Sequence, residues 1–217
     1  MQNWIMGIYV ATVFFAAISS LVSFRMDFPF HLKLFSCLLV LTAFVELPAA
    51  ILAYRKINNW WLYNLFMPVE FTVYAWYYLH IIKARIARRM LQSFLLLFPV
   101  FWFVLIFRPG LRGWIGPLST VGAFFCVVFA LMYYYQAITA KELVSLRTLP
   151  EFWVATGMLI FYISSIGFFG MLNYIIKDNK VAVELLTVYL IPDIVMYAFF
   201  GYAFKCGINN ITRSSSP

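Results

Sequence analysis

Three acidic residues lie deep inside long apolar stretches of this sequence, with no lysine or arginine at a similar depth to pair with them. They are Glu46, Glu70 and Asp193. An ionised carboxylate near the middle of a bilayer costs at least ~2.5 kcal/mol on insertion scales, so such residues normally face the protein interior. We therefore expect these acids to be protonated, hydrogen-bonded inside a helical bundle, or neutralised by something bound.

Each acid also has a proline close by in the chain: Glu46-Leu47-Pro48, Pro68-Val69-Glu70 and Pro192-Asp193. Proline leaves the carbonyl four residues earlier without its helical partner, and it tends to bend the helix. Acids and freed carbonyls at one depth predict an oxygen-rich site where three helices meet.

Tyrosines at helical spacing accompany two of the acids. Tyr189, Asp193 and Tyr197 are four residues apart, so they share one helix face. A second stripe follows the three-and-four spacing through Tyr63, Met67, Glu70, Tyr74 and Tyr77. The candidate ligand- or proton-binding residues are Glu46, Glu70, Asp193, Tyr63, Asn64, Tyr74, Tyr189 and Tyr197. The competing interpretation is that the acids are protonated, bonded to tyrosines, and purely structural.

The rest of the chain has the composition of a membrane protein. Its 217 residues are 65% hydrophobic and only 11% charged, whereas soluble domains carry about 25% charged residues. A spanning helix needs about 20 apolar residues. We expect an all-α polytopic bundle in one domain, residues 1–206, with a short disordered cytoplasmic tail at 207–217. The seven predicted spans are 3–23, 34–54, 60–82, 91–107, 117–138, 151–176 and 183–206.

The basic residues predict the orientation of the bundle. One side of the predicted membrane holds ten: Arg25, Lys33, Lys83, Arg85, Arg88, Arg89, Lys141, Arg147, Lys205 and Arg213. The other side holds six: Arg55, Lys56, Arg108, Arg112, Lys177 and Lys180. Because cytoplasmic loops carry the excess of lysine and arginine, the N-terminus is expected outside and the C-terminus inside.

Several specific chemistries find no support in the sequence. The net charge of +8 comes from short runs between apolar stretches, which indicates lipid headgroups rather than nucleic acid. The three cysteines have no metal-ligand spacing, and His31 and His80 lie near the predicted inner surface on separate segments. A retinal Schiff base needs a lysine midway along the last helix, but Lys205 is near that helix's end. We therefore expect no cofactor and no metal.

Two short patterns resemble a known group of proteins. Leu62-Tyr63 precedes Glu70-Phe71 in the third span, and the sixth span opens with Phe152-Trp153 followed by Gly157, Leu159 and Tyr162. These patterns resemble uncharacterised small seven-helix membrane proteins of Bacteroidota, which are often encoded near sensor histidine kinases. The resemblance implies a multi-pass protein of a bacterial inner membrane with a role in signalling. It supplies no catalytic role for any residue.

The sequence leaves two main hypotheses for function. The first is a receptor or sensor that binds a small or lipid-like ligand, cationic or hydrogen-bond-donating, in the bundle and signals through a separate membrane partner such as a histidine kinase. The second is a proton-coupled small-solute transporter or channel that uses the carboxylates. An intramembrane enzyme acting on lipid is the least favoured alternative, and assembly into a homo-oligomer is left open.

Overall fold

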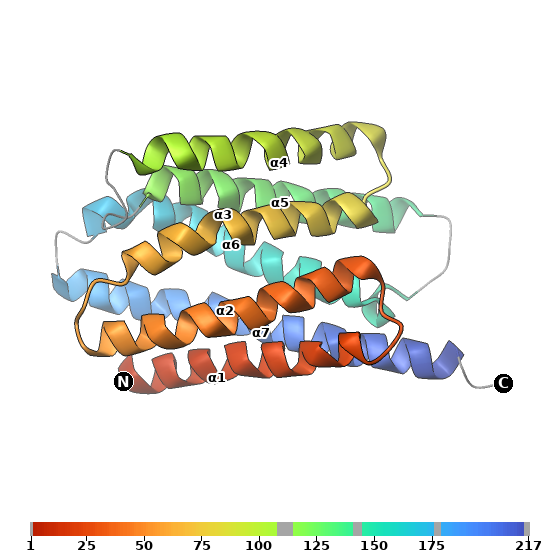
Figure 1. Ribbon diagram of the computed structural model, residues 1–217, viewed down its shortest axis with the longest axis horizontal. Helices are drawn as coiled ribbons and strands as arrows, with labels where there is room; N and C mark the ends of the chain where they lie inside the picture. The colour runs from red at the N-terminus through yellow and green to blue at the C-terminus, as the bar shows by residue number, and fades with distance from the viewer. Residues whose placement is uncertain (1, 108–114, 141–144, 176–178, 215–217) are drawn as a thin grey trace.

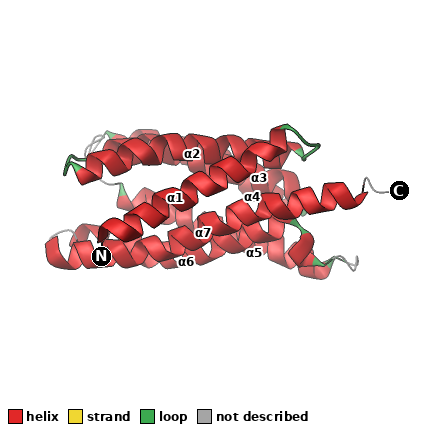
Figure 2. Ribbon diagram, turned by 90° about the horizontal axis from the view of Figure 1, so that it is seen from below, coloured by secondary structure: helices red, strands yellow, loops and turns green. Residues whose placement is uncertain are grey.

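A computed structural model describes residues 2–107, 115–140, 145–175 and 179–214, without the side chains of 2, 3, 169–175, 179–187, 210, 213 and 214. The described part of the chain is helical and contains no strand (Figure 2). Its helices are α1 (Gln2–Ser20), α2 (Phe30–Tyr54), α3 (Trp60–Ile81), α4 (Arg85–Ile106), α5 (Gly116–Thr139), α6 (Pro150–Ile175) and α7 (Asn179–Ser214). Short 3-10 helices lie at Leu21–Phe24 and Leu146–Thr148.

Six of these helices are long and apolar enough to cross a membrane, which makes the chain a multi-pass membrane protein. The remaining helix is α3. It has 22 residues, as many as α4, but its sequence includes Asn64, Glu70 and His80. These polar side chains lower its hydropathy below that of its neighbours.

Several helices extend beyond the predicted spans. The fourth helix begins at Arg85 rather than residue 91, because its basic first turns are helical. The expected disordered tail from residue 207 is helical as far as Ser214, and residues 215–217 lie outside the described ranges. Packing explains the extension, since Ile208 and Ile211 rest against the hydrophobic core and the ring of Phe28 occupies the place where a Cβ on Gly207 would be.

Six helices form a closed ring, and α4 lies outside it. Going round the ring, α1 packs on α2, α2 on α3, α3 on α5, α5 on α6, α6 on α7, and α7 on α1. The helix α4 packs against α3 and α5 (Figure 1). This order places the polar helix α3 inside the assembly, with α4 covering part of its outer face.

The helices run up and down, so the two termini lie at opposite ends of the bundle (Figure 1). We call these the N-terminal end, which also holds the α2–α3 turn, and the C-terminal end. The basic residues with described side chains are Arg55 and Lys56 at the first end, and Arg25, Lys33, Lys83, Arg85, Arg88, Arg89, Arg147 and Lys205 at the second. Arg108, Arg112, Lys141 and Lys177, and the side chains of Lys180 and Arg213, lie outside the described part.

Polar side chains tie the helices together at the C-terminal end. His31 on α2 meets Glu151 on α6 with 2.9 Å between Nε2 and Oε1, and both side chains are mostly buried. Arg88 donates to the carbonyl of Leu79 at 2.6 Å, which satisfies an end carbonyl of α3. Gln136 of α5 donates to the carbonyl of Ile81 at 2.9 Å.

The contact between α6 and α7 depends on one glycine. A Cβ added at Gly157 would lie 3.1 Å from the backbone carbonyl oxygen of Met196 and 3.3 Å from Phe200. Gly167, on the same helix, has nothing within 4 Å of the equivalent position. Small residues let membrane helices approach closely, and only Gly157 of this pair is used in that way.

We expect Gly157→Leu to destabilise the bundle by about 1–3 kcal/mol, because the added side chain must push the backbone of α7 away. Gly167→Leu is the matched control and should leave stability close to that of the wild type. Thermal unfolding of the two purified variants in the same detergent measures the difference. Equal melting temperatures for the pair would contradict the close α6–α7 contact.

Candidate ligand-binding site

A cavity of about 370 Å³ lies on the axis of the six-helix ring. Every ring helix contributes to its wall, whereas α4, all of whose residues are described, contributes none. The lining residues are Met6, Tyr9, Glu46, Ala49, Ala50, Ala53, Asn59, Trp60, Tyr63, Phe66, Met67, Glu70, Phe71, Ser119, Phe161, Tyr162, Phe168, Tyr189, Leu190, Asp193, Met196 and Tyr197. All three intramembrane acids are therefore in one cavity.

Each acid has tyrosine hydroxyls beside it. Tyr63 donates to Glu46 over 3.1 Å, so the second and third helices are joined across the cavity. Tyr9 of α1 is placed to hydrogen-bond with both Glu46 and Asp193. The side chains of Glu46 and Asp193 are only 6% and 7% exposed. These two carboxyls thus share a donor on a third helix.

Glu70 has a separate pair of tyrosines. Tyr74, one helical turn further along α3, donates to Oε1 of Glu70 over 3.0 Å. Tyr162 of α6 reaches the same oxygen at 3.5 Å. Glu70 is therefore held from its own helix and from α6, which is two places away from α3 in the ring.

The remaining candidate residues divide into two groups. Tyr189 and Tyr197 line the cavity on either side of Asp193, and the Tyr189 hydroxyl lies 3.1 Å from that of Ser165. Tyr74 reaches the site through Glu70 without lining the cavity. Asn64 is fully buried but is not among the described lining residues of the cavity.

The backbone carbonyl of Asn64 is bonded outward, to α4, rather than within its own helix. Pro68 has no N–H, so it leaves that carbonyl without its helical donor. The indole N–H of Trp102 on α4 donates to it over 2.7 Å instead. The other carbonyls freed by the prolines near the acids belong to Phe44 and Val188, and neither residue lines the cavity. The predicted oxygen-rich site therefore consists of carboxyls and phenols, without a contribution from freed carbonyls.

Two site residues were not predicted from the sequence, Tyr9 and Tyr162. Tyr9 is the only tyrosine in the first apolar stretch, and that isolated hydroxyl was the available signal. Tyr162 belongs to the sixth-span pattern but has no acid near it in sequence. Its role depends on α6 lying two places from α3 in the ring, which the sequence does not show.

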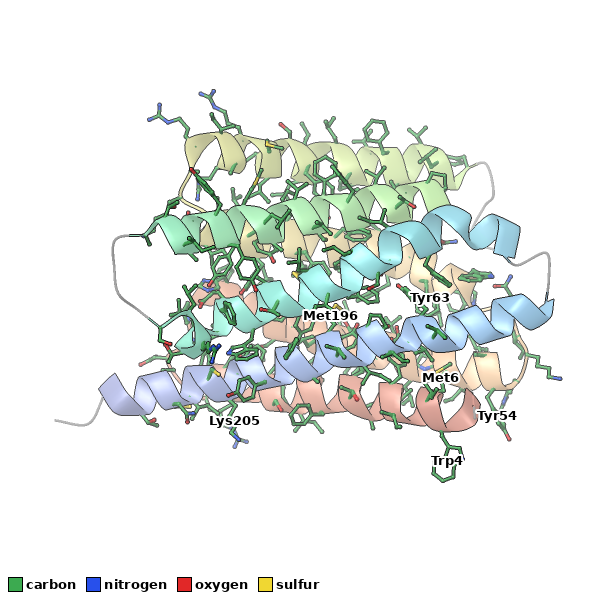
Figure 3. The ribbon with its side chains drawn as sticks, turned by 180° about the vertical axis from the view of Figure 1, so that it is seen from behind. Trp4, Met6, Tyr54, Tyr63, Met196 and Lys205 are labelled. Atoms are coloured by element: carbon green, nitrogen blue, oxygen red, sulfur yellow. The ribbon has the colours of Figure 1, made fainter. Side chains whose placement is uncertain are left out.

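The cavity opens at the N-terminal end of the bundle. Ala53 is exposed there, and Met6, Asn59 and Trp60 are partly exposed. Met6 and Tyr63 lie toward this end and Met196 lies midway along the bundle (Figure 3). Beyond Glu70 the axis is filled by a layer of buried rings, the aromatic floor, in which Phe35 contacts Tyr74, Tyr77 and Phe200. The cavity is thus a pocket with one open end.

The wall combines negative and apolar groups. None of the described lining residues is basic, and the surface between the acids is formed by side chains such as Phe66, Phe161 and Met196. Within the described part of the chain, no three His, Cys, Asp or Glu side chains are grouped closely enough to hold a metal ion. Carboxyls that are spread over the wall, with aromatic faces between them, suit an organic cation better than a metal.

Fold and cavity together define the class: a multi-pass helical membrane protein with an acid- and tyrosine-lined pocket inside a ring of helices. No protein-family model, curated protein or solved structure matches the chain.

Replacing Trp102 by phenylalanine should destabilise the protein by about 1–3 kcal/mol, because the Asn64 carbonyl loses its donor while it remains buried. Trp61→Phe, at a tryptophan that is 40% exposed, is the control and should have little effect. Thermal unfolding in detergent measures both variants.

Proline removal gives an independent check on this explanation. In a Pro68→Ala background, the N–H of residue 68 can donate to Asn64, so Trp102→Phe should cost less than it does alone. An unchanged cost in that background would show that Trp102 stabilises the bundle by packing rather than by this hydrogen bond.

Proposed function

We propose that the protein is a seven-span receptor or sensor of a bacterial inner membrane, with its N-terminus outside and its C-terminus in the cytoplasm. The ligand is a small or lipid-like molecule that carries a cationic or hydrogen-bond-donating group. One observation carries the proposal: three acids with tyrosine partners line a single pocket that opens at one end of the ring. In this orientation, the pocket opens on the outer face.

The chemistry of the wall supports a cationic ligand. An ammonium group offers N–H donors and a positive charge, which the carboxyls need because none of the described lining residues supplies one. Trp60, Tyr63 and Phe161 offer aromatic faces, which attract cations in desolvated sites. The apolar part of the ligand would rest on the phenylalanine and methionine side chains of the wall.

The route from the pocket to a partner would be α7. This helix carries Asp193 and Tyr197 at the pocket and continues to Ser214 at the C-terminal end. Pro192, directly before Asp193, removes a helical hydrogen bond and allows a bend there. A separate membrane partner would detect the change in α7, and the resemblance to proteins encoded near sensor histidine kinases suggests such a kinase.

The alternative is a proton-coupled transporter or channel. Buried carboxyls beside helix-bending prolines are typical of transport sites, and here each carboxyl has a tyrosine that can donate to it. The aromatic floor would then have to open during the transport cycle.

Binding measurements test the ligand class. We expect hexylammonium to bind the purified protein in nanodiscs at least about tenfold more tightly than hexanol, and hexanoate to bind more weakly still, because the wall is acidic. Asp193→Asn should weaken hexylammonium binding by about tenfold. Asp27→Asn, at an exposed acid outside the cavity, should not change it. Equal binding of the three probes would contradict a cation site.

Flux measurements separate the two functions. If the protein is a receptor, proteoliposomes should show saturable hexylammonium binding without movement of protons or of the amine across the membrane. Proton or amine flux that disappears in Glu70→Gln would instead establish the transporter. Empty liposomes and the Asp27→Asn protein provide the baseline and the matched control.

A further inference from the structure

The acids in the cavity are divided between two levels along the ring axis. The upper level, nearer the open end, contains Glu46 and Asp193 with Tyr9 between them. The lower level contains Glu70, with Tyr74 and Tyr162 as its hydrogen-bond partners. None of these three tyrosines is a hydrogen-bond partner of acids at both levels.

The helix α3 gives the spacing of the levels. Tyr63 bonds to Glu46 at the upper level, and Glu70 belongs to the lower one. These two positions of α3 are two turns apart, which corresponds to about 10 Å of helix rise. The acids are nevertheless close enough for their charges to interact, since Asp193 is affected electrostatically by both glutamates.

Apolar side chains occupy the wall between the levels. Phe66 and Met67 lie between Tyr63 and Glu70 on α3, and Met196 lies about one turn beyond Asp193 on α7. All three line the cavity. A ligand that reaches from one level to the other must therefore pass along a hydrophobic surface, which methylene groups do favourably.

The number of charges also favours two cationic groups. Neighbouring carboxylates such as Glu46 and Asp193 repel each other, so a proton shared between them leaves one negative charge at the upper level. Glu70 provides the lower one. A ligand with a single ammonium group would bind at one level and leave the carboxyl of the other without a positive partner, because none of the described lining residues is basic.

We propose that the cavity binds a linear dication, an α,ω-diamine in chemical class, with one ammonium group at each acid level and its methylene chain along the wall between them. This inference rests on the proposed function, because it specifies the ligand of the same cavity. The ammonium at the lower level is held by Glu70, and the one at the upper level by Glu46 and Asp193.

The test compares diamines with monoamines of the same length. Linear diamines with about four to eight methylene groups cover the roughly 10 Å between the levels. Each is titrated into the protein in nanodiscs beside the monoamine of equal chain length. We expect one diamine length to bind at least about tenfold more tightly than its monoamine, with shorter and longer diamines weaker.

Variants assign the two ends of the ligand. Glu70→Gln should reduce the best diamine to the affinity of its monoamine while leaving the monoamine bound at the upper level, and Asp193→Asn should weaken both. Asp27→Asn is the control for each titration. Melting temperatures without ligand show whether each variant is folded. Glu70→Asp keeps the carboxyl group at the lower level, so this variant should still bind diamines more tightly than monoamines.

The outcomes distinguish the two proposals. If monoamines bind the wild type and no diamine binds more tightly, the cation site stands and the dication inference is overturned. If neither class binds the folded wild-type protein, both proposals fail. A diamine preference that survives Glu70→Gln would also overturn the inference, because the lower level would then have no part in it.

Discussion

A carboxyl group inside a membrane bundle needs hydrogen-bond partners, because water is not available to solvate it. The ring of six helices meets this need with tyrosines. Tyr63 donates a hydrogen bond to Glu46, and Tyr74 and Tyr162 donate to Glu70. A phenol donates a hydrogen bond without adding a charge of its own, so the cavity keeps its acids and remains free of fixed cations. An arginine or lysine in the same place would neutralise the acids.

The same requirement explains why α3 lies where it does. It is the helix that falls short of the apolar character of the other six, and it carries Glu70 together with Tyr63 and Tyr74. Neighbours on three sides, α2, α4 and α5, cover it. The role of α4 is then to shield α3 from lipid, and Trp102 satisfies the one backbone carbonyl that Pro68 leaves without a donor.

Part of this arrangement could be predicted from the sequence because it follows from local chemistry. Apolar length gives helices, and an acid within such a helix must turn inward. The sequence predicted a site where three helices meet, but it could not show that Glu46, Glu70 and Asp193 converge, since that depends on the order of the helices round the ring. Tyr9 was missed because it has no acid in its own helix. The polarity of Asn64 suggested the cavity, but this residue is not among the described lining residues.

The helix boundaries also depend on neighbouring helices, so they too could not be predicted from the local sequence. The basic residues that open α4, from Arg85 to Arg89, look like a loop in sequence, and so do the glycine and serines near the end of the chain. In both places helix formation is decided by neighbours: Arg88 bonds to the end of α3, and Gly207 lies against Phe28. Local polarity therefore does not mark where these helices end.

The packing of α7 determines how a bound ligand would affect the rest of the bundle. Beyond Asp193, this helix has a backbone carbonyl at Met196 against Gly157, and its Gly201 lies close to the ring of Phe15 on α1. Such close contacts leave little room for side chains to adjust individually, so the segment beyond Pro192 moves most easily as a unit. A cation that draws Asp193 toward the cavity axis would therefore tilt this segment and displace its end near Ser214. The acid that binds and the bend that allows movement are neighbours in the chain.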